Sequence, residues 1–284
     1  MRRRDEQWAL DNFTQRYRLA TSGAAAEVER QVIGAVWGVN GYTTRDEADE
    51  LGDRLSLTPQ SKLLDLGAGR GWPGLYLAAR HGCYVVLSDL PHEGLVIALR
   101  TARQRQLASR ASAIVASARR LPLRSATFDA VVHTETLCCL SAKASVLRAS
   151  RQVLKPGGRT AFFTIYVPSG LLKASRRRAL AAAPRYGWSP VSNQQLMQSA
   201  GFADIVEIDC TEQYLWTLRG WYEHSNERDT ELVELWGAEI FRERQADRLA
   251  AIEAVEDGLQ RRVLVCAARP QKRSTRPNGS WRPA

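Results

Sequence analysis

A glycine-rich turn directly after an apolar segment is the feature of this sequence that most clearly suggests chemistry. Residues 63–71 run Leu-Leu-Asp-Leu-Gly-Ala-Gly-Arg-Gly, so that Gly67, Gly69 and Gly71 alternate with other residues. When an apolar strand enters such a turn and continues into a helix, the backbone can approach a ligand closely because no Cβ intervenes. Asp65, near the end of the strand, suits a ligand with an ammonium group better than one with a pyrophosphate. The turn therefore predicts a ligand site at the carboxyl edge of a parallel sheet.

A second group of polar residues follows a later apolar segment. The residues His133, Thr134, Glu135 and Thr136 come directly after the run Phe-Asp-Ala-Val-Val. Histidine is a base near neutral pH, and a carboxylate such as Glu135 can attract an ammonium group or remove its proton. His133 and Glu135 are therefore candidates for proton transfer at the same edge of the sheet.

Large aromatic side chains form a third candidate group, in the segment 211–258. Among them are Trp216, Trp221 and Tyr222. Such rings stack on an aromatic ligand or face a cation, so we predict that these three residues bind a substrate. Their helical spacing leaves packing in the core as the alternative.

Short apolar segments alternate with helical ones from residue 62 onward, and this arrangement can bring the candidate residues together. Strands are predicted at 62–66, 84–88, 113–116, 128–133, 160–166, 205–209 and 262–267, and helices at 74–80, 92–106, 141–154 and 194–200. Near-continuous apolar strands in β-α units imply a parallel sheet covered by helices on both faces, with right-handed crossovers. The predicted fold is therefore α/β and doubly wound.

An N-terminal segment, residues 1–58, precedes the β-α units. Amphipathic periodicity predicts three helices there, at 5–20, 24–37 and 45–55. We expect Gly38 and Gly41 to end the second helix, because glycine readily adopts the left-handed conformation that ends helices.

The β-α units make up the main domain, residues 59–268. Two insertions interrupt its rhythm, at about 168–191 and 211–258, and the second is helical. The remaining residues, 269–284, form a basic tail that is polar and rich in proline, and we expect this tail to be disordered.

The net charge of +10, from 40 Lys and Arg against 30 Asp and Glu, at first suggests a nucleic-acid partner. Eight of these ten charges belong to arginines 2–4 and to the basic tail, so the rest of the chain is nearly neutral. One acid-free run, residues 100–124, contains seven arginines and is a candidate phosphate-binding face. We nevertheless do not expect a nucleic-acid partner.

Neither a membrane span nor a metal site is expected. No stretch reaches the ~18 apolar residues that a span requires, and the basic N-terminus lacks the apolar run of a secretory signal. We therefore expect a soluble, cytoplasmic protein with no membrane partner. The five cysteines form no C-x-x-C pair and stand at no ligand spacing from the four histidines, so we expect reduced thiols.

Five motifs in order make the sequence resemble the class I S-adenosyl-L-methionine-dependent methyltransferases, over roughly residues 60–210 and the last strand. The motifs are Asp65–Gly71, Asp89 after the second strand, Leu121–Leu123, Phe128–Val132 and Leu154–Gly158. The resemblance implies a Rossmann-like, seven-stranded, mostly parallel sheet. It also implies N-terminal helices that cap the cofactor site, a helical lid insertion, and S-adenosyl-L-methionine as the cofactor.

A cofactor site follows from the same resemblance. The three glycines would surround the methionyl part, with Asp65 near its amino group, and Asp89 would accept both ribose hydroxyls. The family commonly has Gly-Asp-Ala at the adenine, whereas this sequence has Ala-Ser-Ala, so Ser117 replaces the acid. The predicted cofactor residues are Tyr42, Asp65, Gly67, Gly69, Gly71, Asp89, Leu90, Ser117, Ala118 and His133.

The resemblance also assigns roles to other candidates. His133 and Glu135 lie where substrate and cofactor meet in the family, which makes them the predicted catalytic residues. The alternatives are that His133 only packs against the cofactor and that Glu135 caps the following helix. Tyr42 lies in a segment that folds over the cofactor in similar enzymes, with packing in a turn as its alternative.

The predicted function is transfer of a methyl group from S-adenosyl-L-methionine to a small-molecule acceptor by in-line displacement. One alternative is an RNA or protein methyltransferase that uses the arginines of residues 100–124, and another is a cofactor-binding protein without catalysis. A literal G-x-G-x-x-G at residues 69–74 also suggests a dinucleotide, but it is offset from the strand end, and Trp72 and Pro73 fill the first helical turn. The sequence identifies neither the acceptor nor the oligomeric state.

Overall fold

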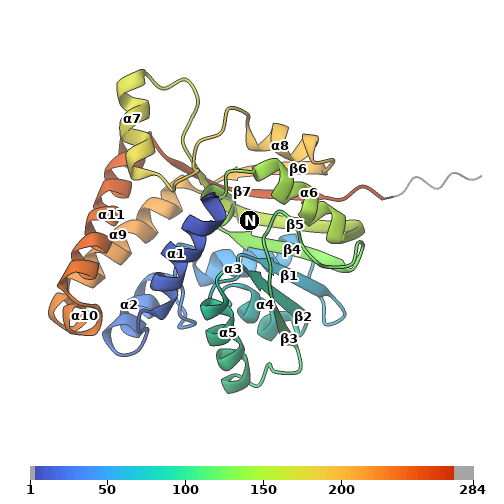
Figure 1. The fold of residues 1–284 in the computed structure, drawn as a ribbon, viewed down its shortest axis with the longest axis horizontal. Coiled ribbons are helices and arrows are strands. Elements are labelled where there is room, and N and C mark those ends of the chain that lie inside the picture. Colours follow the sequence, from blue (N-terminus) through green and yellow to red (C-terminus); the bar gives the residue numbers. More distant parts are fainter. Residues whose placement is uncertain (1–3, 272–284) are drawn as a thin grey trace, which may run out of the picture.

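A seven-stranded sheet organises residues 4–271, the part of the chain that the computed structural model describes (Figure 1). The strand order is β3-β2-β1-β4-β5-β7-β6, and every pairing is parallel except those of β7, which is antiparallel to β5 and β6. The strands are β1 Lys62–Leu66, β2 Tyr84–Asp89, β3 Ala111–Val115, β4 Phe128–Thr134, β5 Leu154–Tyr166, β6 Ala203–Asp209 and β7 Arg261–Ala268. The prediction of a doubly wound, mostly parallel seven-stranded sheet is confirmed.

Helices cover both faces of this sheet and one of its ends. They are α1 Arg4–Arg18, α2 Ala24–Ile33, α3 Arg45–Arg54, α4 Gly74–His81, α5 His92–Gln104, α6 Lys143–Val153, α7 Lys173–Ala182, α8 Asn193–Ser199, α9 Thr211–Asn226, α10 Asp229–Trp236 and α11 Ala238–Glu256, with a 3₁₀ turn at Leu137–Cys139. In Figure 1, α1 lies between the sheet and the helices α9 and α11.

Alternate residues of the central strands pack on opposite faces of the sheet. Leu63 of β1 belongs to a core with Leu75 of α4 and Ala98 of α5, whereas Leu64 belongs to a core with Val146 of α6. Each fully buried leucine side chain contributes about 1.5–3 kcal/mol relative to an exposed one. The near-continuous apolar strands of the sequence are therefore explained by two buried faces.

The second helix ends earlier than the sequence analysis predicted. Gly34, rather than Gly38 or Gly41, adopts the left-handed conformation at its end, with φ 76° and its N–H donated to Arg30 O. The next helix, α3, begins with a capping box in which Thr44 and Glu47 bond each other's backbone N–H groups. The segment between the two helices is thereby left in an irregular conformation and reaches the sheet edge.

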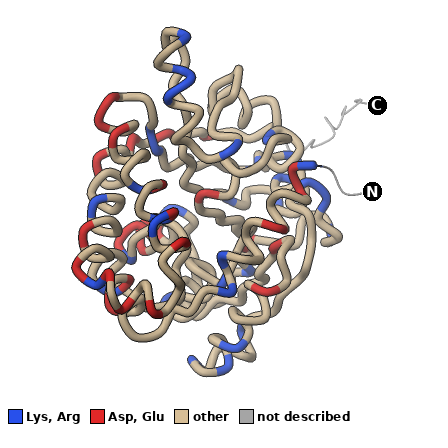
Figure 2. The backbone as a smooth tube through the Cα atoms, turned by 60° about the vertical axis from the view of Figure 1, so that its left-hand side comes forward, with Lys and Arg blue, Asp and Glu red and all other residues tan. Residues whose placement is uncertain are grey.

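Lys, Arg, Asp and Glu are interspersed along the backbone (Figure 2). In the arginine-rich run 100–124, Arg119 forms an ion pair with Asp5, and Arg105 stacks over the Trp37 ring at 3.7 Å. Several of these arginines therefore serve contacts within the fold. Thirteen residues of the predicted basic tail, 272–284, lie outside the described residues.

No helix within residues 4–271 combines the length and the apolarity needed to cross a membrane. All five cysteines are free thiols, as predicted, and Cys83, Cys138 and Cys210 are buried. Across the same residues, no cluster of three or more His, Cys, Asp or Glu side chains has an arrangement that could hold a metal ion.

Candidate active site

A cavity of about 560 Å³ lies where the parallel strands β1, β2, β3 and β4 reach their carboxyl ends. At one end it is lined by the glycine turn after β1 together with Asp89 and Ser117. At the other end it is lined by Glu135, Tyr42 and other residues from the N-terminal segment, β5 and α9. Volumes of about 300–1,000 Å³ are typical of small-molecule sites. The cavity is thus large enough for a ligand that extends from the glycine turn to Glu135.

The glycine turn owes its shape to two positions that a side chain would disrupt. Gly67 has φ +77°, and a Cβ there would overlap the side chain of Thr136. Gly71 has φ +100°, and a Cβ would lie 2.5 Å from Leu75 Cδ1. Gly67 and Gly69 line the cavity, whereas Gly71 packs against α4. The absence of a Cβ at Gly67 and Gly71 therefore lets Thr136 and Leu75 pack against the turn, while the backbone of Gly67 and Gly69 forms part of the cavity wall.

Asp89 at the end of β2 faces the cavity and fixes the turn beside it. Its Oδ2 accepts hydrogen bonds from Gly69 N at 2.8 Å and from Tyr17 Oη at 3.1 Å, and its Oδ1 accepts one from Leu90 N at 2.7 Å. Burial raises the pKa of Asp89 to about 6, although these hydrogen bonds lower it. The carboxylate is therefore ionised near neutral pH and can accept hydroxyl groups of a ligand.

Asp65 does not line the cavity, in contrast to its predicted place beside an ammonium group. Its side chain is 1% exposed, and its Oδ2 accepts a hydrogen bond from Gly74 N, at the start of α4, at 3.0 Å. Burial raises the pKa of Asp65 to about 8. The side chain therefore joins the end of β1 to the first turn of α4 rather than facing a ligand.

The end of the cavity beyond β3 is partly apolar. Leu90, Ala118 and Leu140 line it together with Ser117 and the α1 residue Glu6. Ser117 Oγ donates a hydrogen bond to Glu6 Oε1 at 2.5 Å. This end therefore combines apolar walls with polar groups that include the Ser117 hydroxyl, the Glu6 carboxylate and the Arg119 guanidinium.

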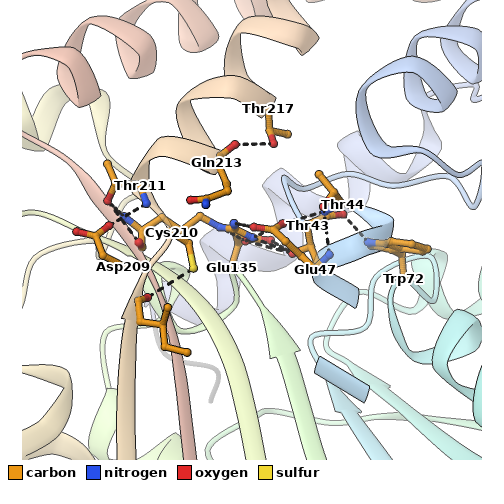
Figure 3. A network of polar contacts seen from close by, with 12 residues as sticks. Thr43, Thr44, Glu47, Trp72, Glu135, Asp209, Cys210, Thr211, Gln213 and Thr217 are labelled. Carbon is orange, nitrogen blue, oxygen red and sulfur yellow. Dashed lines mark hydrogen bonds and ion pairs between the residues drawn. The ribbon is translucent and has the colours of Figure 1, made fainter. Parts of the chain in front are cut away.

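Glu135 follows β4 and lines the opposite end of the cavity, in the left-handed conformation with φ +50°. Its Oε1 accepts a hydrogen bond from Arg262 Nε at 2.9 Å, and Thr43 Oγ1 lies 3.3 Å from its Oε2. The buried guanidinium of Arg262 also bonds both carboxylate oxygens of Glu47. Figure 3 places Thr43, Glu47 and Glu135 around one polar network, which holds Glu135 in a single orientation.

Two opposed effects set the protonation of Glu135. Burial is the larger and raises its pKa, while the Arg262 guanidinium lowers it, so that the pKa stays above its ordinary value. A carboxylate whose pKa is raised in this way is a stronger base than an exposed one. Glu135 is thus the cavity residue best suited to accept a proton or to orient a polar group.

The second predicted catalytic residue, His133, points away from the cavity. It is 1% exposed, and its ring stacks on Phe162 with centroids 4.2 Å apart. Neither ring nitrogen has a hydrogen-bond partner in the described part of the chain, and burial lowers the pKa of His133 to about 3. The neutral ring therefore packs in the core beneath the sheet edge and is badly placed for proton transfer.

Aromatic rings do line the Glu135 end, but they differ from those predicted. Tyr42 lines the cavity as predicted, and its ring packs edge-on against Tyr214, with centroids 5.0 Å apart. By contrast, Trp216 is 61% exposed outside the cavity, Trp221 packs in a core of α2, α9 and α10, and Tyr222 packs against another helical core. None of these three rings lines the cavity, whereas Tyr214 does and takes the place expected for them.

Helix α1 covers the cavity through contacts that sequence reasoning did not find. The buried guanidinium of Arg70, in the glycine turn, donates hydrogen bonds to the carbonyl oxygens of Arg16 at 2.9 Å, Tyr17 at 2.7 Å and Leu19 at 2.7 Å. Tyr17 in turn reaches Asp89. The only signal in the sequence was an arginine inside an otherwise small-residue turn. α1 is therefore hydrogen-bonded both to the glycine turn, through Arg70, and to the end of β2, through Asp89.

Comparison with known proteins adds an independent line of observation. A family model described as "Methyltransferase domain" matches residues 64–162. The chain is 30% identical over 171 residues to phosphoethanolamine N-methyltransferase of Triticum aestivum, covering 60% of this chain and 33% of that protein. It is 32% identical over 177 residues to methyltransferase GfsG of Streptomyces halstedii, covering 58% and 61% respectively. The chain thus spans less than two thirds of either relative.

A solved structure extends the likeness of the fold. It is phosphoethanolamine N-methyltransferase 2 of Haemonchus contortus, in complex with phosphomonomethylethanolamine and S-adenosylhomocysteine. The TM-score is 0.77 at 17% identity, over 91% of this chain and 59% of that chain.

Proposed function

We propose that the chain is a class I S-adenosyl-L-methionine-dependent methyltransferase and that it transfers a methyl group from this cofactor to a small-molecule acceptor. The observation that carries the proposal is one continuous cavity. It joins the glycine turn and Asp89 to an acceptor end that holds the carboxylate of Glu135. A donor at the first end and an acceptor at the second would meet inside the protein.

The residues around the glycine turn fit the cofactor. Gly67 and Gly69 line the cavity, and their backbone would hold the methionyl part. The Asp89 carboxylate would accept the two ribose hydroxyls. When bound, the cofactor supplies a sulfonium methyl group, which needs little electrophilic activation. The protein's main task is therefore to place the acceptor.

Placement and exclusion of water follow from the walls of the cavity. α1 lines the site and would help to exclude water, while the acceptor end would hold a nucleophile in line with the methyl group at about 3–3.5 Å. Glu135, fixed by Arg262 and Thr43, would orient a hydroxyl or ammonium group of the acceptor and take up its proton. Glu135 is the catalytic residue in this proposal, and Arg262 is a positioning residue.

The acceptor end favours a small and largely apolar molecule that carries one polar group. Apart from Glu135, its walls include Tyr42, Ile165, Cys138 and Tyr214. These groups stabilise apolar surface, and the Glu135 carboxylate selects where the polar group of the acceptor lies. A macromolecular acceptor is less compatible with this cavity, because residues of α1 form one of its walls.

Variants of the two predicted catalytic residues test the proposal. With a metabolite extract as the source of acceptor, we expect Glu135→Gln to lower the rate of S-adenosylhomocysteine formation by about 10²-fold or more, the usual loss for an acid–base residue. Calorimetric affinity for S-adenosylhomocysteine should be unchanged. His133→Asn and the exposed control Glu234→Gln should retain the wild-type rate within about twofold. Equal rates for wild type and Glu135→Gln would refute the role of Glu135.

A further inference from the structure

The base-binding end of the cavity contains a carboxylate from an unexpected element. Ser117 stands after β3 at the position where the methyltransferases that this sequence resembles commonly have an acid, so the residue there contributes a hydroxyl instead of a carboxylate. Glu6 comes from α1, 111 residues away, and its Oε1 accepts a hydrogen bond from Ser117 Oγ at 2.5 Å. Both residues line the cavity. A carboxylate is therefore present at this end of the cavity, but it belongs to Glu6 of α1 rather than to the sheet.

The neighbouring residue, Asp5, anchors this part of α1. Asp5 is 5% exposed, forms an ion pair with Arg119 and accepts a hydrogen bond from Ser141 Oγ at 2.5 Å. Arg119 Nη2 also donates to Ser141 Oγ at 3.0 Å. Because a buried ion pair holds the first turn of α1 to the residues after β3, Glu6 has a defined position beside Ser117.

The chemistry of this end suits an aminopurine. Leu90, Ala118 and Leu140 provide apolar walls for a flat heteroaromatic ring. A carboxylate has about four lone-pair positions, so Glu6 can accept hydrogen bonds from Ser117 and from an exocyclic amino group together. A hydrogen bond to a charged acceptor is stronger than one to a neutral hydroxyl.

We infer that Glu6 is a cofactor-binding residue whose carboxylate accepts the hydrogen bond of the adenine amino group, in place of the acid missing at Ser117. The inference rests on the proposed function. Selection for the 6-amino group then depends on a residue of α1 rather than on a residue of the sheet. The same helix that lines the site therefore also recognises the base.

Calorimetry with two ligands that differ only at the base tests this inference. S-adenosylhomocysteine presents an amino group at position 6, whereas S-inosylhomocysteine presents a carbonyl oxygen. We expect Glu6→Gln to weaken binding of the adenosyl ligand about tenfold, the loss expected for one hydrogen bond to a charged group. The glutamine amide can donate to the carbonyl oxygen, so the preference for the adenosyl ligand should fall by more than tenfold.

Two further variants separate base recognition from a general effect of charge on α1. Asp11→Asn makes the same change on an exposed face of α1, and it should leave both affinities at their wild-type values. Ser117→Asp should restore the adenosyl preference in the Glu6→Gln background. The same substitution should weaken binding in the wild-type background, where two carboxylates would lie side by side.

The possible failures are distinguishable. If Glu6→Gln binds both ligands within about twofold of wild type, Glu6 does not contact the base and the inference is wrong, while the proposed function stands. If the wild-type protein binds neither ligand, both the proposed function and the inference are wrong.

Discussion

Replacing Arg262 by methionine removes the cation at the centre of the buried network beside the cavity. The Arg262 side chain is fully buried, and those of Glu47 and Glu135 are only 11% and 12% exposed. Methionine fills a similar volume without a charge, so the variant leaves two buried carboxylates without their cation. The substitution therefore tests whether this ion network holds Glu135 and the N-terminal segment in place.

The expected loss of stability is large. Removing one partner of a buried ion pair costs about 3–5 kcal/mol, because the remaining charge stays buried without compensation. For a chain of this size each kcal/mol lowers Tm by about 2–4 °C, so Tm should fall by about 6–20 °C. Activity should fall as well, because Glu135 loses the group that orients it.

The loss should depend on pH in a defined direction. Without Arg262, burial raises the pKa of Glu135 further above its ordinary value of 4.5. A group whose pKa is raised on folding contributes stability that is complete below its unfolded pKa and disappears as pH rises through its folded pKa. The stability deficit of the Arg262→Met variant should therefore be largest near neutral pH and shrink toward about pH 5.

Thermal unfolding of Arg262→Met and Arg261→Met at several pH values provides the assay. Arg261 is the adjacent residue, and its ion pair with Asp209 is about half exposed, so its loss should change stability by about 1 kcal/mol or less. The triple variant Glu47→Gln, Glu135→Gln, Arg262→Met removes the uncompensated charges and should recover most of the lost stability. Equal Tm values for the two single variants, or a deficit that grows at acidic pH, would refute the reasoning.

Three other predictions concern the cofactor end. Because burial raises the pKa of Asp89 to about 6, affinity for S-adenosylhomocysteine should fall as pH drops from about 7 to 5. Asp89→Asn should bind this ligand at least tenfold more weakly, with little dependence on pH. Equal affinities over this pH range, measured by calorimetry at constant ionic strength, would contradict the role of Asp89 as a ligand-binding carboxylate. The pKa of Asp65 is raised from 3.8 to about 8, so ionisation of Asp65 destabilises the fold as pH rises between those values. The Tm of Asp65→Asn relative to wild type should therefore increase from about pH 5 to 9. A Tm difference that stays constant over this range would contradict the raised pKa. A Cβ at Gly94 would lie 2.7 Å from Gly69 O, so Gly94→Ala should lower the free energy of unfolding by about 1–3 kcal/mol in denaturant and weaken S-adenosylhomocysteine binding. Gly220→Ala should do neither, because the atom nearest to a Cβ at Gly220 lies 3.4 Å away. Equal stability and affinity of the two variants would show that the turn tolerates displacement.

The sheet and the glycine turn could be predicted from the sequence because local patterns determine both. The first predicted strand coincides with β1. Four of its five residues are buried, and three of those four are leucines, so the apolar run is visible in the sequence. The alternation of such strands with helices defines a doubly wound sheet. The alternating glycines mark the turn, and the cavity lies at the edge of the sheet that this turn indicates.

His133 shows where local patterns in the sequence were insufficient to predict the role of a residue. His133 and Thr134 are neighbours on β4, and successive strand residues face opposite sides of the sheet. His133 shares the face of Phe162, beneath helices α6 and α8, while Thr134 reaches the cavity. Residue type indicated a base, but the strand period, once its register is known, directs the ring into the core.

The residues that sequence reasoning missed act through contacts between distant parts of the chain. Arg262 reaches Glu135 across 127 residues and Glu47 across 215, and Glu6 reaches Ser117 across 111. No periodicity encodes such pairs. One local signal existed for Arg262, because a charged residue inside an apolar strand needs a buried partner. For Glu6, the signal was the missing acid at position 117.

The central claim is that this cavity transfers a methyl group to a small molecule. The most direct measurement is mass spectrometry of a metabolite extract incubated with the protein and S-adenosyl-L-methionine labelled isotopically in its methyl group. We predict a labelled small-molecule product, formed together with an equal amount of S-adenosylhomocysteine and formed more slowly with Glu135→Gln by about 10²-fold or more. Tight binding of S-adenosylhomocysteine without any labelled product across the extract would contradict the claim, and would instead identify a cofactor-binding protein without methyl transfer.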